Sequence, residues 1–287
     1  MAETIGQIRC TLAEGPLWDS RKNKLYWVDI IGGKIHSYDA DANTFESFNA
    51  GKFVSCILIR QSGSFLIAMK HSVYSLDLHN GIEKLASLDY EPANNRFNDG
   101  KCDAAGRLWL GSMDMDEKRP TGSLYLIDEN LDVQKKAGGL TVSNGIAWSP
   151  DNTKMYHVDS PTRRVYSYRY DLLSGEIFDK ETLIEIPPGE GFPDGITTDT
   201  EGNIYVAQWG GYCVSVWNSG GALIRKIPIP VRNVSSCAFG GVDMRDLFVT
   251  TSAFDLSGEH LKEEKLSGAV FRERNDIRGT ESTPFKG

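Results

Sequence analysis

PDGITTDTEGNIYVAQW, residues 193–209, consists of a short apolar run, a polar DTEG turn and a second run, NIYVAQW. Asp and Gly favour turns, whereas β-branched and aromatic residues favour strands. The same order of polar turn and apolar strand recurs along the chain. The repeated strands are NKLYWVD (23–29), GSFLIAM (63–69), GRLWLGS (106–112), TKMYHVD (153–159), GNIYVAQ (202–208) and RDLFVTT (245–251).

These strands begin about 40 to 50 residues apart, which is the period of propeller blades. A short apolar run precedes each of them and another follows it, and most units then enter a weaker fourth run. The pattern predicts an all-β fold: one six-bladed β-propeller domain over residues 1–287, with four strands per blade. We also expect residues 7–12 to pair into the last blade and close the ring.

The composition of the chain limits the kinds of binding partner and the cellular compartment that we expect. The net charge is −8 and the isoelectric point is near 5.2. This balance argues against nucleic acid or an anionic membrane as the main partner, because both are bound through basic patches. The five cysteines form no CxxC pair, and no signal peptide or apolar membrane span is evident. We therefore expect a cytoplasmic protein with free thiols, either a monomer or a weak homodimer.

A column of polar residues precedes the repeated strands. Counting back 11 or 12 residues from the central strand residue of each unit reaches a side chain that carries oxygen. The column consists of Glu14, Ser55, Asn98, Asn144, Asp194 and Ser236. Each lies just before the innermost strand of its unit, and innermost strands line the channel of a propeller. The repeat therefore predicts a ring of oxygen atoms at one mouth of the central channel.

The composition of this ring favours a hard cation. Two members are acids and none is His or Cys. Such a set suits Ca²⁺, Mg²⁺ or Mn²⁺, whereas zinc sites usually include His or Cys. Asn, Asp and Ser are also common turn residues, but Glu14 has no such advantage. We therefore predict a metal site at the mouth of the channel.

Several motifs identify a family. AEGPLWD (13–19), NRFNDGKCDAAGRLWLGSM (95–113), SNGIAWSPDNTKMYHVDS (143–160), FPDGITTDTEGNIYVAQWGG (192–211) and SSCAFGG (235–241) resemble the SMP-30/gluconolactonase/regucalcin (LRE-like) family, in order over about residues 13–273. The resemblance implies a six-bladed propeller that holds one divalent cation near the channel mouth. Many members of that family hydrolyse sugar lactones.

The resemblance also implies roles for individual residues. Its metal ligands fall on Glu14, Asn144 and Asp194, and its sugar contacts fall on Arg96 and Asn98 of NRFND. A further acidic contact falls on Asp116 in the 113–122 loop, where the neighbouring Asp114 and Glu117 are alternatives. Ca²⁺ is the first choice of cation, with Zn²⁺, Mn²⁺ and Mg²⁺ as alternatives.

Together these features predict a metal-dependent lactonase that opens a small sugar lactone to the aldonic acid. The cation would polarise the carbonyl and activate water, and Asp194 would be the general base. Two alternatives stay open: a non-catalytic, calcium-binding regulatory propeller, and the same metal chemistry on a non-sugar ester or phosphotriester. The polar loop MDMDEKRPTG (113–122) favours a polyhydroxy substrate over an apolar one.

Overall fold

The polar turns of the repeat connect the two inner strands of a unit. In a computed structural model that describes residues 2–78 and 80–287, the DTEG turn joins β18 (Phe192–Thr198) to β19 (Ile204–Trp209). Asp199 Oδ1 accepts hydrogen bonds from the backbone N–H groups of Glu201 and Asn203, each at 2.9 Å. Gly202 supplies the left-handed backbone, with φ of 83°. Side-chain bonds to the turn therefore stabilise the hairpin that the sequence predicts.

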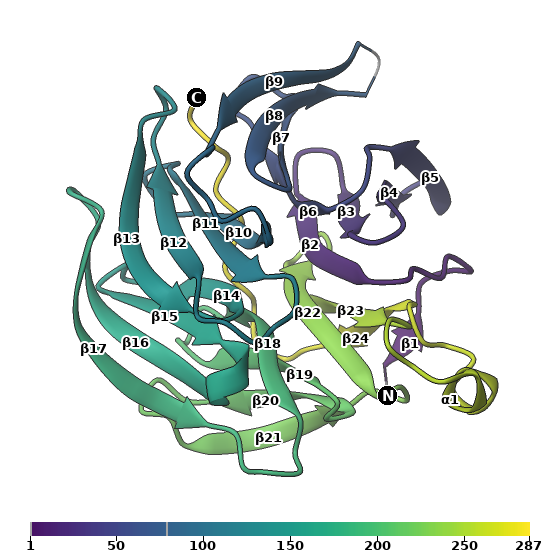
Figure 1. Cartoon of the computed structure of the whole chain (residues 1–287). Coiled ribbons are helices and arrows are strands. Elements are labelled where there is room, and N and C mark those ends of the chain that lie inside the picture. Colours follow the sequence, from purple (N-terminus) through teal and green to yellow (C-terminus); the bar gives the residue numbers. More distant parts are fainter. Residues whose placement is uncertain (1, 79) are drawn as a thin grey trace.

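Four sheets contain four antiparallel strands each, arranged around a central axis (Figure 1). The first contains β2 (Ala13–Asp19), β3 (Lys24–Asp29), β4 (Lys34–Asp39) and β5 (Thr44–Asn49). The second contains β6 (Val54–Ile59), β7 (Phe65–Met69), β8 (Ser72–Asp77) and β9 (Gly81–Ser87). The third contains β10 (Asn95–Cys102), β11 (Leu108–Asp114), β12 (Gly122–Ile127) and β13 (Val133–Leu140). The fourth contains β14 (Ser143–Trp148), β15 (Lys154–Asp159), β16 (Arg164–Asp171) and β17 (Glu176–Glu185).

The remaining strands form one larger sheet. It contains β18 and β19, then β20 (Cys213–Trp217), β21 (Leu223–Pro228), β22 (Asn233–Gly240), β23 (Asp246–Ser252), β24 (Val270–Arg274) and β1 (Glu3–Thr4). A short helix, α1 (Gly258–Glu263), lies between β23 and β24, and a 3₁₀ turn, η1 (Ser160–Thr162), follows β15. In the described part of the chain, no helix is long and apolar enough to cross a membrane.

The all-β class and the propeller arrangement are confirmed, but the prediction of six four-stranded blades is wrong. Hydrogen bonding among the described residues gives four four-stranded sheets and one eight-stranded sheet. The last two repeat units are joined because Trp209 of β19 pairs with Asn233 of β22. A single backbone pair between neighbouring units leaves the apolar pattern unchanged, so the repeat does not reveal it.

The N-terminus closes the sheet at a different place from the one predicted. β1 pairs with β24, and Glu3 lies opposite Arg272, whose guanidinium donates to the Glu3 carboxylate at 2.6 Å. Of the predicted closing segment, residues 7–12, Leu12 forms an isolated bridge with Ser252. The strand pairing thus lies a few residues nearer the N-terminus than expected.

The first strand of every repeat unit lines the axis. β2 contacts β6, β6 contacts β10, β10 contacts β14, β14 contacts β18, β18 contacts β22, and β22 contacts β2, so these strands close a ring. Each of them changes its pairing register near its N-terminal end. The register shifts lie between Glu14 and Leu17, Val54 and Cys56, Phe97 and Gly100, Ser143 and Ile146, Pro193 and Ile196, and Val234 and Ser236. Such bulges redirect side chains, and these coincide with the predicted polar column.

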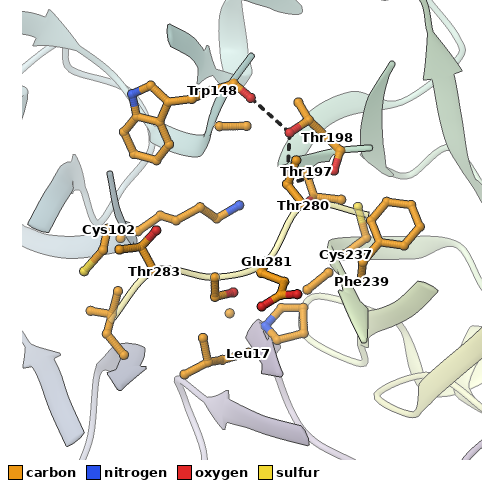
Figure 2. Close-up of a pocket in the computed structure, with 18 of the residues that line it drawn as sticks. Leu17, Cys102, Trp148, Thr197, Thr198, Cys237, Phe239, Thr280, Glu281 and Thr283 are labelled. Carbon is orange, nitrogen blue, oxygen red and sulfur yellow. Dashed lines mark hydrogen bonds between the residues drawn. The ribbon is translucent and has the colours of Figure 1, made fainter. Parts of the chain in front are cut away.

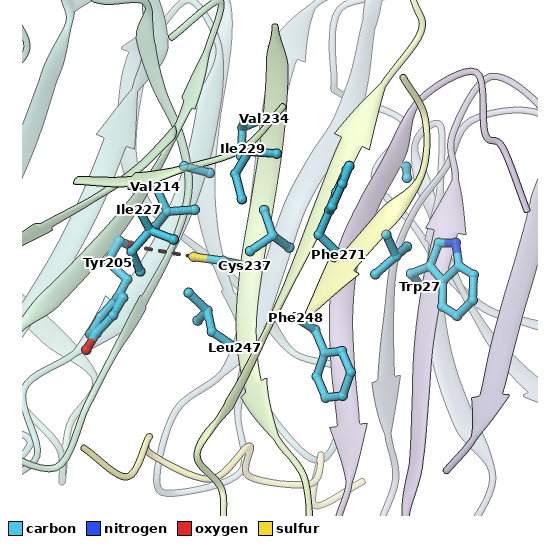
Figure 3. Close-up of a cluster of buried hydrophobic side chains, with 14 of the residues drawn as sticks. Trp27, Tyr205, Val214, Ile227, Ile229, Val234, Cys237, Leu247, Phe248 and Phe271 are labelled. Carbon is cyan, nitrogen blue, oxygen red and sulfur yellow. Dashed lines mark hydrogen bonds between the residues drawn. The ribbon is translucent and has the colours of Figure 1, made fainter. Parts of the chain in front are cut away.

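The apolar core lies between neighbouring sheets. In the cluster drawn in Figure 3, Trp27 of the first sheet lies near Phe248 and Phe271 of the eight-stranded sheet. The rings of Trp18 and Phe248 also stack, with centroids 5.4 Å apart. These contacts fix the first sheet against the last one and leave the axis free for polar side chains.

The C-terminal segment, residues 278–287, crosses the far end of the channel. The Thr280 N–H donates to the Thr198 carbonyl at 3.1 Å, and the Phe285 N–H donates to the Ile59 carbonyl at 2.7 Å. Between these anchors the segment borders a cavity of about 240 Å³ inside the channel (Figure 2). The segment therefore links the C-terminal ends of inner strands that belong to different sheets.

Removing the Phe285 ring should destabilise the whole propeller. Phe285 is fully buried in the apolar cluster between the second and third sheets. We expect Phe285→Ala to lower the free energy of unfolding by about 3–5 kcal/mol, measured by chemical denaturation. Phe178→Ala, which truncates a ring that is 41% exposed, is the matched control and should cost under about 1 kcal/mol. Equal losses in the two variants would contradict this anchoring role.

Candidate functional site

The proposed metal ligands lie on three inner strands at the same end of the channel. Glu14 is on β2, Asn144 is on β14 and Asp194 is on β18, each at the register shift of its strand. All three side chains are buried. The rest of the predicted column, Ser55, Asn98 and Ser236, is also buried on the corresponding strands. The structure therefore brings the column together as a ring.

Two oxygen atoms of this ring have no hydrogen-bond donor among the described residues. They are Asn144 Oδ1 and Asp194 Oδ1, and both are fully buried. Asn144 Nδ2 in contrast donates to Ser160 Oγ at 3.1 Å, which fixes the amide. Buried polar atoms in folded proteins almost always have partners, so these two acceptors in the ring could serve as ligands of a cation.

The acids of the ring repel one another. Burial, followed by the charge of Asp99, raises the pKa of Glu14 from its usual 4.5 to about 8. Burial, followed by the charges of Glu14 and Asp99, raises the pKa of Asp194 well above its usual value, and the Asn144 side chain partly offsets this rise. Desolvation and like charge both disfavour ionised carboxylates, and a bound cation would reverse both effects.

Arg96 supplies positive charge beside these acids. Its guanidinium is buried and donates through Nη1 to the Phe97 carbonyl at 2.9 Å and to Asn98 Oδ1 at 2.8 Å. Burial lowers the pKa of Arg96 to about 10, although the charges of Glu14, Glu117 and Asp194 act in the opposite direction. Asn98 is held in turn, because its Nδ2 donates to the Ser143 carbonyl at 3.0 Å. Arg96 is thus fixed next to the ring with donors to spare.

The 113–122 loop brings Glu117, and not Asp116, into electrostatic contact with the ring. The Asp116 side chain is 63% exposed and accepts a hydrogen bond from Asn94 Nδ2 at 2.9 Å. Glu117 has a left-handed backbone, with φ of 55°, and its carboxylate interacts with Arg96. Burial raises the pKa of Glu117, Arg96 lowers it, and Asp255 raises it.

Asp114 sets the shape of this loop. Its carboxylate accepts hydrogen bonds from Arg119 Nη2 at 2.8 Å and from the backbone N–H groups of Lys118 and Arg119 at 3.1 and 3.0 Å. These bonds tie residues 118 and 119 back to the end of β11. Of the three neighbouring acids in the sequence, Asp114 is therefore structural. Asp116 and Glu117 are both exposed, but Glu117 interacts electrostatically with Arg96 and Asp194.

Asp99 is not among the site residues that the sequence predicts, but the structure places it under the ring. Asp99 and Lys101 line the cavity inside the channel, and Lys101 Nζ donates to the Ile196 carbonyl at 2.8 Å. Burial raises the pKa of Asp99, and the charge of Lys101 lowers it. Since Asp99 raises the pKa of both Glu14 and Asp194, it adds negative charge to the ring from below. Its position directly after Asn98 in NRFND is the signal that could have indicated this role.

A buried Ser–His pair lies beside Asn144 but does not form a hydrolytic triad. Ser143 Oγ and His157 Nε2 are 2.8 Å apart, and both residues are fully buried. His157 Nδ1 has no partner within the described part of the chain, and burial lowers the pKa of His157 to about 3. Without an orienting acid or access to a substrate, the pair supports the backbone next to Asn144.

A second group of possible metal ligands lies away from the ring. Cys10, Asp29 and His36 place one ligand atom each within 4.8 Å of one another. The Asp29 carboxylate already accepts hydrogen bonds from the backbone N–H groups of residues 11, 12 and 32, and His36 Nδ1 lies 2.7 Å from Ser47 Oγ. These contacts account for the cluster as a polar anchor of the N-terminal segment. As expected, all five cysteines are free thiols.

Comparisons with known proteins identify the family of this chain. Residues 12–253 match the family model described as the SMP-30/Gluconolactonase/LRE-like region. The 6-deoxy-6-sulfogluconolactonase of Pseudomonas putida is 34% identical over 278 residues, which cover 96% of this chain and 95% of the relative. Regucalcin of Gallus gallus is 33% identical over 294 residues, which cover 99% of this chain and 98% of the relative.

A solved structure of a luciferin-regenerating enzyme superposes with a TM-score of 0.94 at 30% identity, and the match covers 100% of this chain and 99% of that one. The resemblance that the sequence motifs indicate is thereby confirmed. This chain belongs to the SMP-30/gluconolactonase/LRE-like family.

Proposed function

We propose that this protein is a metal-dependent hydrolase that opens a sugar lactone to the aldonic acid. Family membership and the 34% identity to a named gluconolactonase support the reaction class. The single observation that carries the metal dependence is the pair of buried, unpartnered oxygens, Asn144 Oδ1 and Asp194 Oδ1, beside Glu14.

Glu14, Asn144 and Asp194 are the residues that would hold the cation. Their donors are two carboxylates and one amide oxygen, a set that suits a hard ion, and we propose Ca²⁺. Two ionised carboxylates would balance the charge of one divalent cation. Three protein donors would leave room for water and for substrate, since Ca²⁺ takes six to eight oxygen ligands.

When bound, such a cation polarises a lactone carbonyl and acidifies a coordinated water. Asp194 is the proposed general base, because the carboxylate oxygen that does not hold the cation could accept a proton from the attacking water. Arg96 would donate to sugar hydroxyls and to the new carboxylate of the product. Asn98 holds Arg96 through Oδ1 and retains a second lone pair and a second N–H for a sugar hydroxyl.

We assign the acidic contact of the 113–122 loop to Glu117 in place of Asp116. Glu117 interacts with Arg96 and raises the pKa of Asp194, so its carboxylate lies within electrostatic reach of the ring. A carboxylate at that position can accept hydrogen bonds from two sugar hydroxyls. The exposed Asp116 is bound to Asn94 instead.

The competing function is that of a calcium-binding propeller without catalytic turnover. The similarity to regucalcin supports this alternative. A buried Arg96 with spare donors beside the ring favours the hydrolase, because a site for calcium alone gains nothing from a neighbouring cation. Activity measurements on metal-depleted protein separate the two functions.

Removing the metal or the Asp194 carboxylate should abolish turnover. The experiment follows acid release from gluconolactone, xylonolactone and galactonolactone by chelator-treated protein, with Ca²⁺, Mn²⁺, Mg²⁺ or Zn²⁺ added back. We expect one or more cations to restore activity in the wild type. In Asp194→Asn, kcat should fall by roughly 10²–10⁴, because the base is lost while the shape is kept.

The control variant is Asp243→Asn, because Asp243 is an exposed acid that pairs with Arg274. Asp199→Asn is unsuitable as a control, because Asp199 stabilises the turn between β18 and β19. Asp243→Asn should retain wild-type turnover. Calcium binding without turnover of any lactone above the spontaneous rate would refute the hydrolase and favour the binding protein.

Stabilisation by the cation should increase with pH. The pKa values of Glu14 and Asp194 are raised in the folded protein. Below about pH 4.5 both side chains are protonated, so their burial does not destabilise the fold. As the pH rises through about 8, their burial destabilises the metal-free protein. A bound cation offsets this repulsion. We expect saturating Ca²⁺ to raise the melting temperature by at least about 4 °C more at pH 8 than at pH 5, measured by differential scanning fluorimetry.

Glu14→Gln is the matched variant for this measurement, since it removes one of the titrating acids and keeps the volume. Its metal-free form should lose less stability between pH 5 and 8 than the wild type. An equal Ca²⁺-induced shift at both pH values would contradict the electrostatic account of the ring.

The two neighbouring acids of the loop should respond differently to neutralisation. We expect Glu117→Gln to lower kcat/KM for the preferred sugar lactone by about 10-fold, mainly through KM, because a charged hydrogen bond to substrate is lost. Asp116→Asn should stay within about 2-fold of wild type, since the Asp116 carboxylate is bound to Asn94 and not to the substrate. The two variants are compared by steady-state kinetics. A larger loss of kcat/KM in Asp116→Asn than in Glu117→Gln would assign the substrate contact to Asp116.

A further inference from the structure

A second pocket opens at the same end of the channel as the ring. Its volume is about 300 Å³, and it is lined mainly by loops that flank the starts of β18 and β22 (Figure 1). The lining includes Arg163, Arg232, Phe192, Trp209 and Asp255, together with backbone of three glycines. We refer to it as the arginine pocket, because two guanidinium groups from distant parts of the sequence meet there.

Arg163 is held in place with donors left over. Its backbone is left-handed, with φ of 61°. Nε donates to the Ile186 carbonyl at 3.2 Å and Nη2 donates to the Pro187 carbonyl at 2.8 Å. The guanidinium also lies over the Phe192 ring, 4.4 Å from its centroid. A guanidinium fixed in this way loses little entropy when it binds an anion.

Arg232 supplies a second, freer cation. Its backbone N–H donates to a Glu264 carboxylate oxygen at 2.8 Å, but within the described residues its guanidinium has no hydrogen bond or ion pair. Other acids near the pocket are largely engaged elsewhere. Glu264 also binds Tyr212 and Ser267, and Glu190 is paired with Lys226 at 2.6 Å.

Asp255 is the acid that faces this pocket directly. It carries a left-handed backbone, with φ of 60°, and it raises the pKa of Glu117. Two arginines against one lining carboxylate leave the pocket with a net positive charge. Such a pocket suits a group with at least one full negative charge and several acceptor oxygens.

The arginine pocket lies close to the candidate active site. Phe192 lines the pocket and Asp194 lies two residues further along β18, a distance of roughly 7 Å in an extended strand. Asp255 provides a second link, since it interacts with Glu117, which interacts with Arg96. A hexose-derived lactone has about this length between its carbonyl carbon and the substituent on its last carbon.

We propose that the arginine pocket binds an anionic substituent, a phosphate or a sulfonate, at the end of the sugar lactone opposite the carbonyl. The proposal rests on the lactonase function proposed above. Arg163 and Arg232 would donate to the oxyanion, the glycine backbone would let it approach closely, and Asp255 would accept from a neighbouring sugar hydroxyl. The preferred substrate class is thus an acidic sugar lactone rather than a neutral one.

The test compares ligands without and with an anionic group on the last carbon, in wild type and in Arg232→Gln. Affinities for gluconate, 6-phosphogluconate and 6-sulfogluconate are measured by calorimetry in the presence of Ca²⁺, and turnover is measured on the corresponding lactones. We expect wild type to favour one or both anionic ligands at least 10-fold over gluconate, and high salt to weaken this preference. The two anionic arms distinguish phosphate from sulfonate.

Arg232→Gln should lose most of this preference and leave the affinity for gluconate within about 2-fold. Arg164→Gln is the matched control, because Arg164 is next to Arg163 but pairs with Glu185 on the outside of the sheet. It should behave as wild type. The absence of a preference in wild type, or its survival in Arg232→Gln, would overturn the proposal.

Failure of this proposal is distinct from failure of the proposed function. Turnover of neutral lactones without any preference for anionic ligands would refute the arginine pocket alone. Absence of turnover on all lactones would refute the hydrolase, and the calorimetric comparison would still decide whether Arg232 binds the anion.

Discussion

Repulsion among Glu14, Asp99 and Asp194 is the constraint around which this molecule is organised. Three carboxyl groups meet in a place where burial already disfavours their ionised forms. Arg96 and Lys101 supply two positive charges nearby, and burial lowers the pKa of both. A fold that keeps such a cluster destabilises itself unless a further cation is present, which is why the unpartnered oxygens of Asn144 and Asp194 are informative.

The scaffold tolerates this cost because the apolar core lies elsewhere. Large side chains such as Trp27, Phe248 and Phe271 fill the spaces between sheets, so the axis contributes little to the apolar burial that stabilises the fold. The inner strands can therefore contain register shifts that direct polar side chains toward the axis, with little loss of apolar burial. In addition, the C-terminal segment joins strands of different sheets at the far end and restrains the channel where it carries no polar ring.

The sequence predicts the ring because a repeat places equivalent residues at equivalent positions, so each of six polar residues falls near the start of an inner strand. It predicts strands and turns for the same reason. It cannot choose between Asp116 and Glu117, because that choice depends on the left-handed backbone at Glu117 and on the bonds made by Asp114. Nor does it predict the joining of the last two units or the course of residues 278–287, since neither follows from the repeat.

The two ends of the channel consequently have different roles. The far end is crossed by the C-terminal segment, and below the ring the channel is lined by Asp99 and Lys101. The near end carries the ring, Arg96, the 113–122 loop and the arginine pocket, whose charged groups come from separate loops. A substrate that enters there meets an acidic centre with the cationic groups of Arg96 and of the arginine pocket nearby. Such a combination favours a ligand with an electrophilic carbonyl at one end and negative charge at the other, because that ligand can interact with both regions at once.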